Sequence, residues 1–260
     1  MDLELTDRRA LVTGGSRGIG LAAARALAGE GADVALVARG REALEQAAER
    51  VASESGRRAI AVPADTGDNA SVTAMVEEVV GQLGGVDILV NAAATPATGA
   101  PFTDDDLEGE LNVKFRGYLR CARAVAPHMV ERGWGRIINI SGLAARSTGS
   151  IVGTVRNVAV AAMSKNLADE LGPHGVNVTV LHPGMTRTER TPGALAAMAD
   201  ARGTTPEELE RRLESGVSIG RLVTAEEVAS VVAFLASPKS VALNGDPVVV
   251  SGGARGPIHY

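Results

Sequence analysis

The chain is poor in aromatic residues and in cysteine. Only 2% of its 260 residues are aromatic, and the one cysteine is Cys121. A surface that stacks nucleic-acid bases needs exposed aromatic side chains, and an internal disulfide needs two cysteines. The composition therefore excludes an internal disulfide and argues against a base-stacking surface. A single cysteine also fits a cytoplasmic protein, which is the location we expect.

Long apolar runs and an excess of positive charge are missing as well. The longest clean apolar run, residues 228–236, is far shorter than the roughly 20 residues that cross a bilayer. The first residues show none of the layout of a secretory signal. The net charge of −5 is spread along the chain, whereas a nucleic-acid surface needs a basic stripe. We expect neither a membrane nor a nucleic acid as a partner, and no metal.

Short β-branched runs alternate with longer amphipathic segments from start to finish. Seven apolar runs predict strands at residues 9–14, 33–39, 58–65, 86–92, 135–141, 176–184 and 247–253. Strands that are apolar on both faces belong in a sheet covered on both sides. Strand–helix–strand units form right-handed crossovers. The pattern predicts an α/β fold, a doubly wound seven-stranded parallel sheet with helices on both faces, as one domain over residues 1–260.

A glycine-rich turn follows the first predicted strand. Residues 13–20 read TGGSRGIG and open a helix. Glycines in this turn let a pyrophosphate approach backbone N–H groups at the positive end of the helix. Because a strand precedes it and a second strand follows at the right distance, a Rossmann-like dinucleotide site is favoured over a plain structural turn. The expected cofactor contacts are Gly14, Ser16, Arg17, Gly18, Ile19 and Gly20.

The charges near this turn indicate which dinucleotide binds. An acidic residue at the end of the second strand would hold a ribose 2′-hydroxyl and repel a 2′-phosphate, but the chain has Ala38 followed by Arg39 there. Arg17 adds a second guanidinium suited to bidentate phosphate binding. We expect NADP rather than NAD. The alternative is that the two arginines merely face solvent.

The spacing Thr-Gly-x-x-x-Gly-x-Gly resembles that of the short-chain dehydrogenase/reductase family, and the resemblance covers almost the whole chain. It implies an oxidoreductase fold, a homodimer or homotetramer, and a substrate-covering segment at residues 187–220. It also implies roles for residues that match the motifs of the family. These are Asp65 for adenine, Asn91 in the stretch after the fourth strand, Asn112 and Ser141 for catalysis, and Pro183, Gly184 and Thr188 for the nicotinamide.

The resemblance also exposes a missing pair. The family has a tyrosine about a dozen residues after the serine and a lysine four residues later, so that both face one pocket. Aligning residues 164–172 with the end of that helix places the two positions at Gly153 and Asn157. Glycine has no side chain and an amide does not ionise, and a shift by one or two residues brings only Thr154 or Val155. We expect an atypical or impaired active site.

Partial substitutes for the pair are available. Asn157 could still hydrogen-bond a ribose hydroxyl, so cofactor binding would survive. His182 could titrate near neutrality or simply bond to local backbone. In the C-terminal tail, 254–260, His259 or Tyr260 could enter the site of a neighbouring subunit, or the tail could cover an interface or fray. Tyr118, the other tyrosine, is interpreted as packing or interface.

Two further expectations concern the substrate and the assembly. The apolar residues of the covering segment either line a cavity for a mainly apolar substrate or pack on the domain; they are Leu195, Ala196, Met198 and Ala199. Residues 204–214 carry the threonine, proline and early acids of a helix start. The helices expected at 112–130 and 152–171 are rich in small residues, which suits contact between subunits.

Three functions remain open from the sequence. The first is an NADP(H)-dependent oxidoreductase of a carbonyl or alcohol with an unusual proton donor. The second is another enzyme class on the same scaffold, such as a lyase or hydrolase, because a fold does not fix its chemistry. The third is a catalytically silent dinucleotide-binding sensor or partner subunit. The intact glycine turn favours the first and third.

Overall fold

A seven-stranded parallel sheet forms the centre of the molecule in the computed structural model, which describes residues 1–95 and 101–256. The strand order is β3-β2-β1-β4-β5-β6-β9. The strands are β1 Arg9–Thr13, β2 Asp33–Ala38, β3 Ala59–Pro63, β4 Ile88–Asn91, β5 Gly135–Ile140, β6 Val176–Pro183 and β9 Pro247–Val250. The order reverses between β1 and β4, which is where such sheets bind ligands. The predicted fold class is confirmed.

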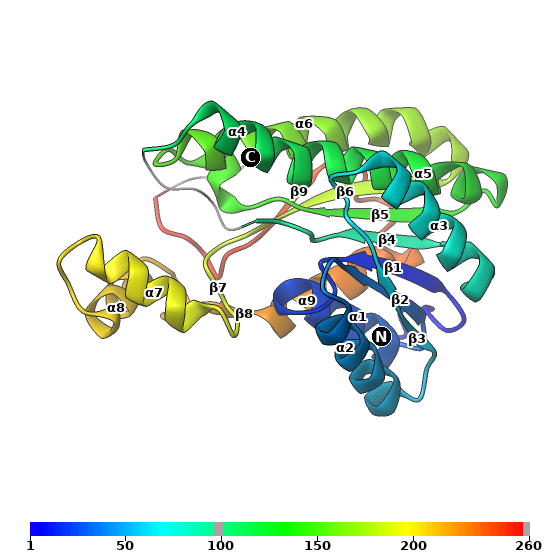
Figure 1. The fold of residues 1–260 in the computed structure, drawn as a ribbon, viewed down its shortest axis with the longest axis horizontal. Coiled ribbons are helices and arrows are strands. Elements are labelled where there is room, and N and C mark those ends of the chain that lie inside the picture. The colour runs from blue at the N-terminus through cyan, green and yellow to red at the C-terminus, as the bar shows by residue number, and fades with distance from the viewer. Residues whose placement is uncertain (96–100, 257–260) are drawn as a thin grey trace.

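Helices cover both faces of the sheet (Figure 1). One face carries α1 Gly18–Gly29, α2 Arg41–Ser55 and α9 Ala225–Ala236. The other carries α3 Asn69–Leu83, α5 Gly117–Glu131 and α6 Ile151–Leu171. Helix α4, Asp104–Glu110, runs into α5 through a π-helical turn, Leu111–Arg116. Short 3₁₀ segments lie at Leu143–Arg146, Gly172–His174 and Pro238–Ser240.

The two faces have separate cores built from small and branched aliphatic residues. Alanines of α1 pack under α9 on one side, with Ala23, Ala24 and Leu27 fully buried. Valines and methionines of α3, α5 and α6 fill the other side, for example Val125 and Met129. Strands whose side chains are buried on both faces need no polar alternation, which is why the apolar runs predicted them well.

Side-chain caps begin several helices. Asp68 accepts a hydrogen bond from Ser71 N (2.7 Å) at the start of α3, and Ser150 accepts one from Gly153 N (3.0 Å) at the start of α6. Thr224 and Glu227 form a reciprocal capping box on α9. In contrast, Arg17 at the start of α1 makes no capping bond. The first N–H groups of α1 are therefore left without a side-chain acceptor at the carboxyl edge of the sheet.

The segment between β6 and α9 projects from the sheet on one side (Figure 1). It contains α7 Thr191–Asp200 and α8 Pro206–Ser215, and a small sheet of β7 Thr186–Arg187 and β8 Val223–Thr224. Leu195 and Ala199 are buried against Leu209 of α8, so the packing alternative holds for these two residues. The predicted start of α8 is confirmed, because Thr205 accepts from Glu208 N (3.2 Å).

The described residues bear on two expectations, one about the C-terminal tail and one about membranes. His259 and Tyr260, for which entry into a neighbouring site and a tail that covers an interface or frays were both left open, lie outside the described residues. Within residues 1–95 and 101–256, no helix is long and apolar enough to cross a membrane.

Candidate active site

The glycine-rich turn joins β1 to α1 at the edge where the strand order reverses. Gly14 has a φ of +68°, and a Cβ added there would lie 2.9 Å from the backbone of Ala92. A Cβ added at Gly20 would lie 2.2 Å from the carbonyl oxygen of Gly14. Both positions therefore require glycine, since any side chain would push the turn away from α1 or from the loop after β4. This close approach is the one that a bound pyrophosphate needs.

Arginine side chains lie near this turn. Arg17 and Arg39 are exposed, and neither forms an ion pair with a residue in the described part of the chain. Partial burial and then the nearby charge of Arg17 lower the pKa of Arg190, whereas Glu189 opposes the shift. Arg190 therefore lies in the field of Arg17. This arrangement suits an anionic ligand with several charges.

The remaining residues expected at the adenine end lie close to one another. Asp65 is exposed after β3, and its carboxylate accepts a hydrogen bond from Gly67 N (2.8 Å). Asn112 lies beside it: its amide donates to Gly67 O (3.1 Å) and accepts from Arg120 (2.8 Å). The structure thus places Asn112 next to the loop after β3, and none of its hydrogen bonds within residues 1–95 and 101–256 goes to Ser141. Its catalytic role stays a prediction.

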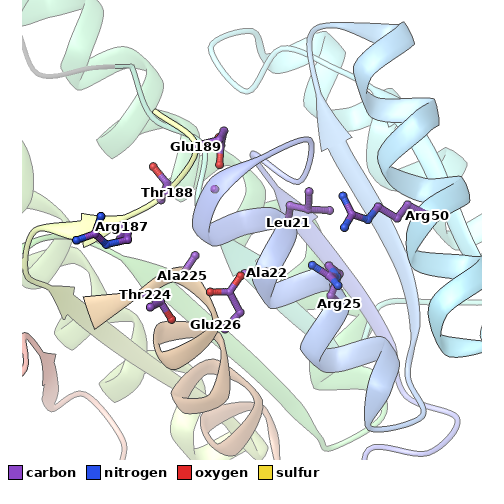
Figure 2. A pocket seen from close by; sticks show the side chains of 11 residues that line it. Leu21, Ala22, Arg25, Arg50, Arg187, Thr188, Glu189, Thr224, Ala225 and Glu226 are labelled. Carbon is purple, nitrogen blue, oxygen red and sulfur yellow. The ribbon is translucent and has the colours of Figure 1, made fainter. Parts of the chain in front are cut away.

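A pocket of about 340 Å³ flanks the outer side of α1 (Figure 2). Gly18 and Thr188, two predicted cofactor residues, line it. The other residues come from α1, α2, the segment after β7 and the start of α9; they are Leu21, Ala22, Arg25, Arg50, Arg187, Glu189, Thr224, Ala225 and Glu226. Ser141 and Asn157 do not line this pocket. It therefore belongs to the cofactor side of the site and not to the end of β5.

Ser141, at the end of β5, faces the predicted positions of the missing pair. Its hydroxyl donates to the backbone oxygen of Asn157 (3.0 Å) and lies 3.3 Å from the side-chain Oδ1 of the same residue. The Asn157 amide donates in turn to Gly153 O (2.7 Å), one turn earlier on α6. These hydrogen bonds bring Ser141, Gly153 and Asn157 together. The assignment of Gly153 and Asn157 to the tyrosine and lysine positions of the family stays a prediction.

A side chain added at Gly153 would meet one neighbouring side chain. An added Cβ would lie 3.0 Å from the hydroxyl oxygen of Ser150 and 3.2 Å from its Cβ, with no other described side chain within 4 Å. Ser150 is the half-buried cap of the same helix and accepts from Gly153 N. A larger residue at Gly153 therefore requires the Ser150 side chain to shift by a few tenths of an ångström.

Lys114 is the residue that the sequence analysis missed. It is 5% exposed, lies in the π-helical turn, and donates from Nζ to the carbonyl oxygen of Ser141 (2.7 Å). Burial, and secondly the charge of Arg156, lower its pKa to about 7, and Glu110 opposes the shift. One signal was present: Lys114 precedes Tyr118, Cys121 and Val125 at steps of four, three and four, which is the spacing of the buried face.

A buried ion pair lies beside Lys114. Arg156 on α6 and Glu110 at the end of α4 are 2.5 Å apart, and Arg156 also donates to Thr95 O (3.2 Å). Arg156 sits among apolar neighbours in the sequence, so charge pairing across two helices could not be anticipated from spacing. The cluster of Lys114, Glu110 and Arg156 carries one positive charge in excess when all three groups are ionised.

Tyr118 is fully buried and donates its hydroxyl to Ile140 O (3.1 Å). Burial raises its pKa well above the ordinary range. Its interpretation as a packing residue is confirmed. Asn91 is buried as well, and its amide donates to Asn139 Oδ1 (2.9 Å) and Tyr118 O (3.3 Å). These bonds connect β4 to β5 and α5, so the side chain of Asn91 stabilises the packing of the sheet.

The end of β6 supplies the remaining predicted residues. His182 is 1% exposed and is followed by Pro183. Gly184 N donates to Val250 O (3.0 Å), and a Cβ added at Gly184 would lie 3.1 Å from Ser251. Thr188 N donates to the Thr191 hydroxyl (2.8 Å). This turn therefore returns the chain toward the start of α1, where Thr188 borders Gly18.

No group of three or more His, Cys, Asp or Glu side chains that could hold a metal ion occurs in the parts of the chain described, residues 1–95 and 101–256. The polar groups at the carboxyl edge include amides, hydroxyls, guanidiniums, the Lys114 amine, the Asp65 carboxylate and the His182 imidazole. The donors among them suit phosphates and carbonyl oxygens, and the acceptors suit hydroxyls.

Comparisons with known proteins cover nearly the whole chain. The sequence profile of the family described as enoyl-(acyl carrier protein) reductase matches residues 14–255. Short-chain reductase protein NovJ of Streptomyces niveus is 37% identical over 94% of this chain and 92% of its own. L-Sorbose reductase of Gluconobacter frateurii, solved with NADPH and L-sorbose, superposes with a TM-score of 0.92 at 29% identity, covering 99% and 100% of the two chains. NAD⁺-bound xylitol dehydrogenase superposes with a TM-score of 0.90 at 27% identity, covering 96% and 100%.

Proposed function

The chain belongs to the short-chain dehydrogenase/reductase family, and we propose that it binds NADP(H) and interconverts a carbonyl and an alcohol at an atypical active site. The observation that carries the proposal is the glycine turn at the strand-order reversal, where α1 begins without a side-chain cap. A scaffold converted to cofactor-free chemistry, such as a lyase or hydrolase, would have no need of such a turn.

The residues present fit a dinucleotide. Gly14 and Gly20 allow the close approach of a pyrophosphate, and the open N–H groups of α1 favour its charge. Ser16, Gly18 and Ile19 complete the turn, and by resemblance to the family we assign Asp65 to adenine and Thr188, Pro183 and Gly184 to the nicotinamide. When bound, the nicotinamide supplies or accepts a hydride.

The preference for NADP rests on Arg39 and Arg17. Relatives of this fold bind either dinucleotide, as the NADPH complex of L-sorbose reductase and the NAD⁺ complex of xylitol dehydrogenase illustrate. At the end of β2 this chain has Ala38 and Arg39 in place of an acid, and Arg39 has no anionic partner in the described residues. A free guanidinium at this position favours a ribose 2′-phosphate.

The atypical part of the proposal concerns α6. By resemblance to the family we assign Gly153 and Asn157 to the positions of its tyrosine and lysine, and neither side chain ionises. Ser141 stays in position to orient a substrate oxygen, with its hydroxyl beside Asn157. This loss supports a second candidate function, a catalytically silent NADP-binding sensor or partner subunit, because the cofactor site is intact whereas the usual proton donor is absent.

The relatives narrow the substrate class. L-Sorbose reductase and xylitol dehydrogenase act on sugars or polyols, and the polar groups around Ser141 suit a hydroxylated ketone. The mainly apolar substrate expected from the covering segment loses support, since Leu195 and Ala199 pack on α8. A homodimer or homotetramer and a cytoplasmic location complete the proposal.

The proposal is tested by titrating the protein with NADPH and with NADH, following the fluorescence of the reduced nicotinamide. Binding is followed by a turnover screen with ketoses, polyols, cyclic ketones and diketones. Tighter binding of NADPH together with oxidation of NADPH on at least one carbonyl supports the enzyme. Tight binding without turnover on the panel supports the silent protein, and no binding of either dinucleotide contradicts both.

A further inference from the structure

Lys114 differs from the other lysines of the chain. The sequence contains three, Lys114, Lys165 and Lys239. Lys165 and Lys239 are on the surface and pair with Asp169 and Glu4. Lys114 is buried, and among the described residues its Nζ makes one hydrogen bond, to Ser141 O at 2.7 Å. An ammonium has three N–H donors, so two of them have no acceptor in residues 1–95 and 101–256.

A buried cation with open donors is costly unless it serves a ligand. In a structural role, a neutral amide would hold Ser141 at lower cost, because it would avoid the desolvation of a charge. Lys114 contacts the carbonyl of the residue whose hydroxyl lies beside Asn157, so amine and hydroxyl meet at the same residue. The Asn157 amide in turn donates to Gly153 O (2.7 Å), so this cluster reaches the first turn of α6.

We propose that Lys114 is the proton donor and acceptor of this site, exchanging a proton with the substrate oxygen that Ser141 orients. This inference rests on the proposed oxidoreductase function and assigns its missing acid to a different helix. The amine enters the site from the turn between α4 and α5, whereas Gly153 and Asn157 leave α6 without an ionisable group.

The surroundings of Lys114 favour proton exchange at neutral pH. Burial weakens its hold on the proton, Arg156 on α6 acts in the same direction, and Glu110 on α4 opposes both. Tyr118 on α5 donates to Ile140 O beside it and stays neutral, and His182 ends the neighbouring strand. An acid whose pKa lies near the working pH is the most effective proton donor.

In the direction of reduction, a hydride, an electron pair and a proton move in turn. The carbonyl carbon takes a hydride from a reduced nicotinamide dinucleotide, and the electron pair of the C=O π bond moves to oxygen. That oxygen takes a proton from Lys114 Nζ, which keeps the N–H electron pair and becomes a neutral amine. Solvent then protonates the amine. In oxidation, the neutral amine removes the hydroxyl proton.

The first test measures the amine itself, without turnover. Protein labelled with ¹³C at lysine Cε gives three signals, of which the one absent from Lys114→Gln belongs to Lys114. We expect this signal to titrate near pH 7 and to shift when NADP⁺ is added, whereas the carboxylates of Asp169 and Glu4 raise the pKa of Lys165 and Lys239. A Lys114 signal that titrates with the surface lysines would overturn the proposal.

The second test compares variants on the substrate found in the turnover screen. Lys114→Gln keeps an N–H donor for Ser141 but cannot titrate, and Lys114→Met removes both. If Lys114 donates the proton, both variants lose about 10²- to 10⁴-fold in kcat while NADPH binding is kept. If it only holds Ser141, Lys114→Gln keeps its activity, which refutes the inference and leaves the proposed function intact.

Lys165→Met is the matched control, because it removes a surface lysine of α6 and should leave kcat unchanged. Circular dichroism and the NADPH affinity of each variant establish that it is folded. A wild-type protein that binds NADPH but reduces no carbonyl refutes the proposed reaction and the role of Lys114 together. By contrast, an active wild type together with an active Lys114→Gln variant refutes only the role of Lys114.

Discussion

Glu110 at the end of α4 and Arg156 on α6 form an ion pair of 2.5 Å inside the protein, with side chains 5% and 9% exposed. The pair connects the two segments that flank Ser141, and each partner acts on the charge of Lys114. Removing one member of such a pair leaves the other charge buried and unpaired, which is strongly destabilising.

Glu110→Gln should therefore lower the free energy of unfolding by about 3–5 kcal/mol. Adding Arg156→Met should recover much of the loss, because it removes the stranded charge. Urea unfolding can be followed by the fluorescence of Trp134, the single tryptophan, whose ring lies against Arg8 at 3.8 Å. Glu45→Gln, which breaks the exposed pair with Arg41, should cost less than about 1 kcal/mol. If Glu110→Gln and Glu45→Gln lowered the free energy of unfolding equally, the buried pair of Glu110 and Arg156 would be contradicted.

Lys114 should make stability depend on pH. Its pKa is about 7 in the folded protein and near the ordinary 10.5 in the unfolded chain. Between these values the unfolded chain binds the additional proton, so the free energy of unfolding rises with pH. The difference between wild type and Lys114→Met, measured by urea titration at pH 7 and pH 9.5, should change in favour of wild type at the higher pH. A constant difference would show that Lys114 has an ordinary pKa.

Arg39 should decide the choice of dinucleotide. Arg39→Asp removes a guanidinium from the expected 2′-phosphate and adds a repelling carboxylate, so the affinity for NADPH should fall at least 10-fold while that for NADH is kept or improved. Fluorescence titration of both cofactors measures the change. Arg41→Asp, two residues later on α2, is the control and should have a small effect. Equal affinity of the wild type for the two cofactors would refute the argument from Arg17 and Arg39.

Restoring the family pair should create ordinary chemistry. Gly153→Tyr with Asn157→Lys should give NADPH-dependent reduction of small carbonyls or diketones, because the Ser150 side chain is the one described neighbour that must shift to admit a side chain at residue 153. The new ammonium and Lys114 would both lie beside Ser141, so adding Lys114→Asn should raise stability by removing a like charge. Gly153→Phe with Asn157→Lys has the same bulk without the hydroxyl. Activity in this phenylalanine control would show that the tyrosine is not the donor.

An exposed apolar stripe on α6 should lie in a subunit interface. Ile151, Val155 and Val158 are 66%, 43% and 45% exposed and share one helix face at steps of four and three. Val155→Glu with Val158→Glu should shift the mass measured by light scattering toward that of a single chain. Asn166→Glu, on an exposed part of the same helix, should leave the mass unchanged. A wild-type protein of one chain mass would remove the expected dimer or tetramer.

The sequence predicted the sheet closely because its strands are buried on both faces. The seven apolar runs contain the seven observed strands, and the glycine turn lies where expected. The two-residue strands β7 and β8 were missed because a pair that short carries no periodic pattern. Helix α6 and the juxtaposition of Ser141, Gly153 and Asn157 followed from one-turn spacing.

Apolar runs and helical spacing did not predict the charged cluster beside Ser141. Lys114, Glu110 and Arg156 are polar residues on faces where apolar ones are expected, and they are buried only because two helices bring opposite charges together. Asn112 was assigned by its motif, and the structure directs its amide to Gly67. The π-helical turn, Leu111–Arg116, produces no recognisable pattern in the spacing of hydrophobic residues, so the sequence did not predict it.

That turn, Leu111–Arg116, makes the site sensitive to the length of the chain as well as to its side chains. A π-helical turn accommodates one residue more than an α-helical turn, and each residue of an α-helix advances the helix by about 100°. Deleting one residue from this turn would allow regular α-helical bonding and rotate α4 by about that angle relative to α5. Glu110 would then face away from Arg156, although every residue that forms the contact would still be present.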